Sequence, residues 1–164
     1  MSPRFHSTSW ILFILALSLF SLSGHAGLKK GVKAPEFSLK SLDGPDISLT
    51  QLRKKGYVML IFWETECVYC FSHVRDFNRL HQQYHNKGLT LAAINIRGEH
   101  EMEVREYKKD NNLKYLLLTD RLKNIDAGEK YKVIGSPTIV MVSPKGLIVY
   151  YGHKIPDVTQ WLKK

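Results

Sequence analysis

Two cysteines carry the most specific chemical signal in this sequence. Cys67 and Cys70 are the only cysteines in the chain, and they stand three residues apart in the stretch WETECVYCFSHV. They come shortly after the apolar run YVMLIF at residues 57–62. Two thiols at this spacing can hold a metal ion, form a structural disulfide, or cycle between dithiol and disulfide.

The place of this pair among the predicted elements favours redox cycling. A strand is expected to end near Trp63 and a helix to start near Cys67, so unpaired N–H groups of the first helical turn point at its sulfur. These groups and the helix dipole stabilise a thiolate, which is the attacking species in thiol–disulfide exchange. Cys70 lies one turn deeper, where it can resolve a mixed disulfide.

Two other uses of the same thiols stay open at this point. A disulfide across so short a loop removes little chain entropy, which disfavours a purely structural bond. Cys67, Cys70 and His73 form a C-x-x-C-x-x-H pattern, but zinc usually takes four ligands, with the second pair elsewhere in the sequence. Copper(I) accepts two thiolates and one further soft ligand, so copper carriage is kept as an alternative. The histidines without paired spacing are His81, His85, His100 and His153.

A second constellation is the stretch GSPTIVMV, in which Ser136 and Pro137 come just before an apolar run. X-Pro bonds are the one common place for cis peptides, which occur mostly in tight turns. We expect a cis bond before Pro137, in a turn that lies across from the cysteine pair. The backbone of Ser136 could then pair with a bound substrate chain. Trp63, at the end of the strand before the cysteines, completes the predicted substrate-binding residues.

The rest of the sequence supplies the elements that position these residues. Continuous apolar runs predict buried strands, and a spacing of three to four between apolar residues from Phe71 to Tyr84 predicts an amphipathic helix. The DGPD turn predicts two short strands within residues 33–52. The other predicted strands are residues 57–63, 89–96, 138–143 and 147–152, with a short apolar stretch at 114–120. The other predicted helices are residues 49–56, 99–112, 124–133 and 155–164, the last with Trp161 packed inward.

This order of elements requires both parallel and antiparallel strand pairing. Crossover helices in the first half favour parallel strands, and the PKG turn near the end favours an antiparallel hairpin. Together with the C-x-x-C at a strand–helix junction, the order predicts an α/β protein with a thioredoxin fold. We expect a mixed central sheet flanked by helices, with an N-terminal two-strand extension.

The N-terminal residues have the pattern of an export signal. Residues 10–22 are an apolar run of 13 residues, preceded by Arg4 and followed by small residues up to Ala26. This predicts a signal peptide over residues 1–26, or a membrane anchor through residues 10–22, and a single thioredoxin-like domain over residues 27–164. An exported domain would reach a periplasmic or other extracytoplasmic compartment, where disulfides can persist.

The net charge of +9, from 24 basic and 15 acidic residues, indicates no particular ligand. Lysines and arginines are scattered along the chain instead of gathering on one element, so nucleic-acid binding is not expected. A solvated basic surface is the simplest interpretation. Such a surface can also favour acidic protein partners or an anionic membrane face.

Over residues 33–161 the chain resembles the TlpA/ResA-like branch of the thioredoxin superfamily, which are extracytoplasmic thiol–disulfide oxidoreductases. The stretch APEFSLKSLDG followed by a strand, Trp and C-x-x-C is similar to the opening of that family. The segment YKVIGSPTIVMVSPKG is similar to its closing segment. The resemblance implies that Cys67 is the nucleophile, Cys70 the resolving thiol and Pro137 the cis-proline, with no cofactor required.

Three positions depart from the family pattern. Glu66 stands where Trp is usual, His73 where Glu is often found, and Arg75 where a Pro is usual. An acid beside Cys67 opposes the thiolate and raises its pKa, and Glu64 adds further negative charge. His73 can take over proton relay. We therefore name Glu64, Glu66 and His73 as residues that tune the pKa of the pair, expect a reducing potential, and expect a straighter helix after the cysteines.

A peroxiredoxin shares the APEF-x-L opening but needs the pattern P-x-x-x-T-x-x-C at its peroxide site. The sequence has Leu60 and Glu64 at the Pro and Thr positions, which argues against peroxide reduction. The predicted function is thiol–disulfide exchange with protein substrates, as a monomer supplied by a membrane or periplasmic electron donor. The alternatives are a copper-carrying or partner-binding module without redox turnover, and a structural domain whose disulfide never opens.

Overall fold

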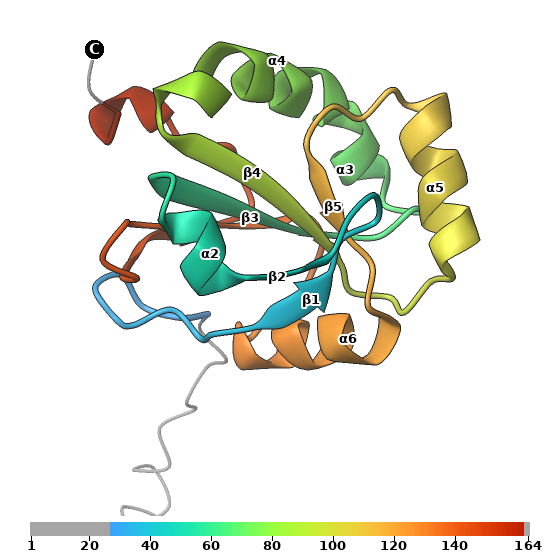
Figure 1. Cartoon of the computed structure of the whole chain (residues 1–164), viewed down its shortest axis with the longest axis horizontal. Coiled ribbons are helices and arrows are strands. Elements are labelled where there is room, and N and C mark those ends of the chain that lie inside the picture. Colours follow the sequence, from blue (N-terminus) through green and yellow to red (C-terminus); the bar gives the residue numbers. More distant parts are fainter. Residues whose placement is uncertain (1–26, 163–164) are drawn as a thin grey trace, which may run out of the picture.

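The apolar runs of the sequence form a central five-stranded sheet. The computed structural model describes residues 27–162 (Figure 1). The strand order is β5-β4-β3-β6-β7, so the strand that leads to the cysteines lies in the middle of the sheet. A strand buried on both faces must be apolar throughout, which explains the uninterrupted run YVMLIFW. The strands are β3 (Tyr57–Trp63), β4 (Leu89–Asn95), β5 (Leu116–Leu118), β6 (Thr138–Val142) and β7 (Ile148–Gly152).

Strand pairing is mixed, as the sequence predicts. Strand β3 pairs parallel with β4, in a register that puts Trp63 opposite Asn95, and β4 pairs parallel with β5. Strand β3 also pairs antiparallel with β6, with Leu60 opposite Val140, and β6 pairs antiparallel with β7. The carboxyl ends of β3 and β4 and the start of β6 therefore meet at the same edge of the sheet.

Alternating side chains of β3 supply two hydrophobic cores, one on each face of the sheet. Met59, Ile61 and Trp63 belong to one core, and Val58, Leu60 and Phe62 belong to the other. This alternation follows from the two-residue period of a strand. Burying both faces of the central strand fixes the point at which the chain leaves the sheet toward the cysteines.

Helices cover both faces of this sheet (Figure 1). Helices α4 and α5 contribute Phe77 and Val104 to the first core, while α2 and α6 contribute Leu52 and Ala127 to the second. Helix α6 starts three residues earlier than the sequence predicts. The helical elements are α2 (Leu49–Arg53), α3 (Val68–Ser72), α4 (Val74–Tyr84), η1 (His85–Lys87), α5 (Glu101–Asp110), α6 (Arg121–Lys130) and η2 (Val158–Gln160).

The two predicted N-terminal strands form a separate small sheet. Strands β1 (Ser38–Lys40) and β2 (Asp46–Ser48) pair antiparallel across the DGPD turn. Ser48 then starts α2 with a capping box, in which its side chain and that of Gln51 each accept from the other residue's backbone N–H. The extension is attached to the main sheet where the Leu42 N–H donates to the Leu117 carbonyl at 2.9 Å.

The helix after the cysteines is broken, contrary to the expectation of a straighter helix. Helix α3 ends at Ser72, α4 begins at Val74, and His73 between them has φ −93° and ψ −4°. The break occurs although Arg75 replaces the usual proline. It also turns Phe71 outward, so this residue is exposed instead of continuing the buried face of α4.

The predicted C-terminal helix is also corrected. Within the described residues this segment forms only the 3₁₀ turn η2, which Asp157 caps by accepting from the Thr159 N–H at 3.0 Å. Pro156 lacks an N–H and the segment is short, so a full α-helix has little to stabilise it. Trp161 does turn inward, where its half-buried ring stacks on Tyr57 with 6.4 Å between ring centroids.

The predicted signal peptide or anchor, residues 1–26, lies outside the described residues. Among residues 27–162, no helix is both long enough and apolar enough to cross a membrane.

Candidate active site

Cys67 and Cys70 are joined in a disulfide at the start of α3, with 5.1 Å between their Cα atoms. Cys67 is the N-cap residue of this helix, and its sulfur accepts a hydrogen bond from the Cys70 N–H at 3.0 Å. The exposed fraction is 9% for Cys67 and 4% for Cys70. The outer cysteine therefore meets the N–H groups of the first turn, as the sequence predicts, and the inner one is covered.

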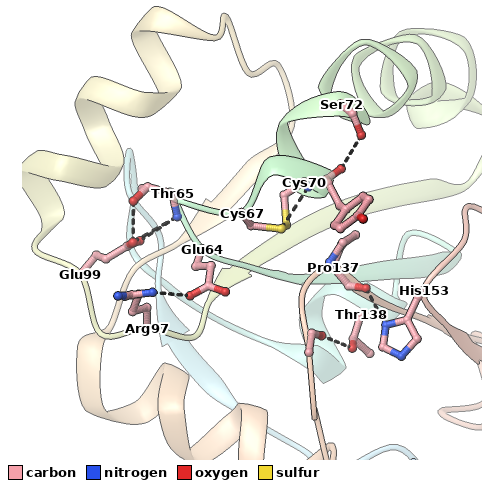
Figure 2. The surroundings of a disulfide bond; sticks show 12 residues. Glu64, Thr65, Cys67, Cys70, Ser72, Arg97, Glu99, Pro137, Thr138 and His153 are labelled. Atoms are coloured by element: carbon pink, nitrogen blue, oxygen red, sulfur yellow. Dashed lines mark hydrogen bonds and ion pairs between the residues drawn. A yellow bond between two sulfur atoms is a disulfide. The ribbon is translucent and has the colours of Figure 1, made fainter.

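The loop between β3 and α3 is held by a carboxylate that the sequence analysis did not single out. Glu99 accepts hydrogen bonds from the Thr65 N–H at 3.1 Å and the Thr65 hydroxyl at 2.5 Å (Figure 2). It also accepts from the side-chain amide of Asn95, at the end of β4. Because Thr65 stands two residues before Cys67, Glu99 ties the approach to the disulfide to the neighbouring strand.

Glu64 and Glu66, the two predicted acidic tuning residues, share one cation. Arg97 lies 3.1 Å from a carboxylate oxygen of Glu64 and 3.1 Å from one of Glu66. The hydrogen bond that Arg97 donates to Glu64 and the charge of Glu66 raise the pKa of Arg97 above its ordinary value. The guanidinium offsets part of the negative charge beside Cys67, which weakens the expected effect of the two acids on the thiolate.

A groove of about 700 Å³ opens beside the disulfide. The peptide bond between Ser136 and Pro137 is cis, as expected, and both residues line this groove together with Tyr69 of α3. Figure 2 shows Pro137 on the side of the disulfide away from Thr65 and Glu99. The whole lining consists of Tyr69, His73, Asp76, Gly135, Ser136, Pro137, His153, Lys154 and Ile155.

Two hydrogen bonds hold the loop that forms the floor of this groove. The Thr138 hydroxyl donates to the Gly135 carbonyl at 2.6 Å. His153, which follows β7, places Nδ1 2.9 Å from the Pro137 carbonyl oxygen (Figure 2). A carbonyl can only accept, so Nδ1 carries the proton in this contact. The role of His153 was not predicted, because only the pairing of β6 with β7 brings it to the loop.

Exposed apolar side chains lie on helix α3, which carries the disulfide, and ahead of the Pro137 loop. Val68 is 76% exposed and Tyr69 is 73% exposed, although both stand between the two buried cysteines. Phe71, one turn on, and Ile134, ahead of the Pro137 loop, are also exposed. Apolar surface gathered around a reactive group is typical of a protein-binding site. The first three of these residues surround Cys70 in the sequence, but only the break at His73 shows that Phe71 faces solvent.

Two further predicted site residues, Trp63 and His73, have different surroundings. Trp63 is 4% exposed and packs against Tyr107 with 4.9 Å between ring centroids. Its ring belongs to the core beneath the site and leaves little surface for direct substrate contact. His73 lies in the groove, with Nδ1 3.9 Å from Asp76 and its ring edge-on to Phe77. It is therefore on the same side of the disulfide as Pro137, while Glu64 and Glu66 lie with Arg97 on the other.

Within the described residues, His73 does not complete a set of three metal ligands with the cysteine pair. In the part of the chain from residue 27 to residue 162, no group of three His, Cys, Asp or Glu side chains is arranged to hold a metal ion. The C-x-x-C-x-x-H pattern therefore does not close around a common point in the oxidised protein.

Comparison with known sequences agrees with this arrangement. The AhpC/TSA family matches residues 30–151. The thioredoxin-like protein YneN of Bacillus subtilis is 31% identical over 151 residues, which cover 85% of this chain and 86% of YneN. The thiol-disulfide oxidoreductase ResA from one strain of Bacillus cereus is 32% identical over 119 residues, 73% of this chain and 66% of ResA.

Solved structures share the fold. The thioredoxin domain of a thiol-disulfide oxidoreductase from Bacteroides vulgatus superposes with a TM-score of 0.71 at 23% identity, covering 77% of this chain and 90% of that domain. A thiol:disulfide interchange protein from Bacteroides sp. superposes with a TM-score of 0.69 at 25% identity. This match covers 76% of this chain and 81% of that protein. These likenesses confirm the predicted thioredoxin fold, and the ResA relatives confirm the resemblance seen in the motifs. The chain therefore belongs to the AhpC/TSA family, as a thioredoxin-like relative of the ResA thiol–disulfide oxidoreductases.

Proposed function

We propose that this protein reduces disulfide bonds of other proteins outside the cytoplasm, through its Cys67–Cys70 pair. One observation carries the proposal. The disulfide lies at the start of α3, beside an open groove and among exposed apolar side chains. A purely structural disulfide does not need such surroundings, whereas a pair that must meet protein substrates does.

The proposed reaction is a two-step thiol–disulfide exchange. In the reduced protein, the Cys67 thiolate attacks one sulfur of the substrate disulfide, which forms a mixed disulfide and releases a substrate thiolate that takes up a proton. The Cys70 thiolate then attacks the Cys67 sulfur and releases the second substrate thiol. The substrate gains two electrons, and this protein is left with its own disulfide. A dithiol donor must return two electrons to start the next cycle.

The groove supports contact with an extended segment of the substrate. Ser136 and Pro137 form its floor, and their loop is held by His153 and by the Thr138 hydroxyl. Exposed apolar side chains such as Tyr69 give this surface affinity without demanding one sequence. We therefore assign substrate contact to Ser136, Pro137 and the exposed face of α3.

The direction of electron flow is proposed from the charges around Cys67. Glu64 and Glu66 with one guanidinium leave a net negative charge beside the thiol. Negative charge disfavours the thiolate and so destabilises the reduced form, which favours a reducing potential. A reductant in an oxidising compartment needs a supply of electrons, for which we propose a membrane or periplasmic dithiol protein.

The compartment is proposed from residues 1–26, whose composition is that of a signal peptide or membrane anchor. Fusion of these residues to alkaline phosphatase, an enzyme that is active only outside the cytoplasm, tests this point. An active fusion supports export. An inactive one places the protein in the cytoplasm and removes this part of the proposal.

Insulin reduction with dithiothreitol as electron source tests the activity itself. The wild-type chain is expected to accelerate precipitation of the insulin B chain, and Cys67→Ser is expected to abolish the acceleration. Cys70→Ser is expected to accumulate a mixed disulfide, visible on a non-reducing gel. Equal rates for Cys67→Ser and the wild type would disprove the proposal. Equilibration with glutathione or dithiothreitol buffers gives the potential, and a value near the oxidising end would reverse the proposed direction.

A further inference from the structure

The end of the sheet opposite the disulfide is built from four segments that are far apart in the sequence. The Tyr57 N–H donates to the Gly88 carbonyl at 2.8 Å, Arg53 donates to the Pro144 carbonyl at 3.0 Å, and the Ala34 N–H donates to the Gly146 carbonyl at 2.9 Å. These contacts join residues 29–34, 53–57, 87–88 and 144–147 into one surface, here called the far end. Figure 1 shows it where β3 and β4 begin, away from α3.

Seven exposed lysines gather at the far end. None of them forms an ion pair with any other residue in the described range 27–162. The one arginine of this surface, Arg53, is already engaged with the carboxylate of Glu36 at 3.0 Å. The result is a concentration of free positive charge. The seven are Lys29, Lys30, Lys33, Lys54, Lys55, Lys87 and Lys145.

Two aliphatic side chains are exposed among these lysines. Val32 is 40% exposed and Leu147 is 38% exposed. They belong to adjacent segments, since the Ile148 N–H donates to the Val32 carbonyl at 2.9 Å. The backbones of Lys33 and Leu147 also form an isolated antiparallel β-bridge. The far end therefore combines exposed positive charge with a small amount of exposed apolar surface.

We propose that the far end binds the surface of an anionic lipid bilayer. Lysine is a flexible point charge that does not require a fixed geometry from its partner, which suits mobile phosphate headgroups. Exposed aliphatic side chains can enter the boundary between headgroups and acyl chains. A specific protein partner fits less well, because protein interfaces are depleted in lysine and enriched in aromatic residues and arginine.

This contact would fix the orientation of the catalytic pair. Strand β3 runs from the far end to the loop that carries Cys67, and its seven residues span about 23 Å at the usual rise of a strand. A bilayer at the far end leaves the disulfide facing away from the lipid and open to protein partners. In the sequence, the apolar run at residues 10–22 ends seven positions before Lys29, so an anchor there would deliver the far end to the same surface.

Binding of the full chain to vesicles tests the inference. Binding to vesicles of phosphatidylcholine with phosphatidylglycerol is compared with binding to vesicles of pure phosphatidylcholine, each at low and at high salt. Binding through residues 1–26 is then common to the two kinds of vesicle. The variant Lys55→Gln/Lys145→Gln removes two charges of the far end. Its control, Lys109→Gln/Lys114→Gln, removes two exposed lysines from elsewhere on the domain.

The far-end variant is expected to lose about 25-fold in partitioning to anionic vesicles at low salt, since each lysine near an anionic leaflet contributes roughly fivefold. The control is expected to match the wild type, and high salt to erase the difference. An equal loss in both variants would overturn the proposal, as would wild-type binding without preference for anionic lipid. When the vesicle-bound protein is treated with a soluble acetylating reagent, Lys55 and Lys145 should be protected but Lys109 and Lys114 should not. Cys67→Ser should bind like the wild type, which separates this test from that of the redox function.

Discussion

Glu99 accepts two hydrogen bonds from Thr65, one from its backbone N–H at 3.1 Å and one from its hydroxyl at 2.5 Å. Thr65 stands in the loop that leads from β3 to Cys67, while Glu99 follows β4. The contact therefore joins the exits of two parallel strands on the approach to the disulfide. A helix start that must present a sulfur atom in one place needs such a fixed approach.

Replacing Glu99 by Ala is expected to lower the free energy of unfolding by about 1–3 kcal/mol, because it leaves donors of Thr65 and Asn95 partly buried without an acceptor. Urea denaturation of the oxidised protein measures this loss. The exposed Glu106, on the same side of the domain, is the control and should change stability by less than about 0.5 kcal/mol when replaced by Ala. Equal stability of the two variants would contradict a supporting role for Glu99.

Arg97 is expected to lower the pKa of the Cys67 thiol in the reduced protein, because it offsets the charges of Glu64 and Glu66. Arg97→Gln should raise that pKa, and Glu66→Gln should lower it. The rate of alkylation of Cys67 by iodoacetamide as a function of pH measures the shift. Arg105→Gln, in an ion-pair network with Asp43, is the matched control and should leave the profile unchanged.

His153 is expected to act as a positioning residue for the loop under the groove. His153→Ala removes the hydrogen bond to the Pro137 carbonyl and should raise KM for a protein disulfide several-fold, with kcat nearly unchanged. Reduction of a small disulfide such as oxidised glutathione should be affected little, since it makes few contacts in the groove. His153→Asn keeps an N–H donor, so its KM for the protein disulfide should lie between that of the wild type and that of His153→Ala. A uniform loss on both substrates would point instead to a general loss of structure.

Tyr131 and Tyr115 are expected to limit stability at high pH. Burial is the main cause that raises the pKa of each phenol above its ordinary value, so the folded protein keeps a proton that the unfolded chain loses above about pH 10. Their contribution to stability is therefore complete below that pH and is lost as the pH rises further. Urea denaturation from pH 8 to about pH 11, with phenolate absorbance as second readout, follows this loss.

Tyr131→Phe tests the assignment. At pH 7 the variant loses the hydrogen bond from the Tyr131 hydroxyl to the Pro35 carbonyl, 2.8 Å long, which costs about 0.5–1.5 kcal/mol. Above pH 10 its stability should fall less steeply with pH than that of the wild type. Tyr69→Phe, at an exposed position, should leave the slope as it is. An unchanged slope in Tyr131→Phe would show that another group controls alkaline unfolding.

Short local patterns in the sequence predicted much of the fold and of the site. The run YVMLIFW specified a strand buried on both faces, and the two cysteines shortly after it favoured a redox pair at a helix start. The placement of Ser136 and Pro137 before a strand could likewise be predicted, because turns and apolar runs are specified by a few neighbouring residues. These signals were enough for the fold, for the chemical class of the site and for the position of the Pro137 loop.

The surroundings of the disulfide were decided by tertiary structure. Arg97 and Glu99 reach the approach to Cys67 only because β3 and β4 pair in a register that puts Trp63 opposite Asn95. The break at His73, which exposes Phe71, has no proline or glycine to announce it.

The same holds for the far end. Its lysines are scattered in the sequence and meet only where the starts of β3 and β4, the turn between β6 and β7 and the N-terminal segment come together. Strand register and the packing of distant segments depend on the whole chain, so a sequence read locally specifies which residues can do chemistry but not which of them become neighbours.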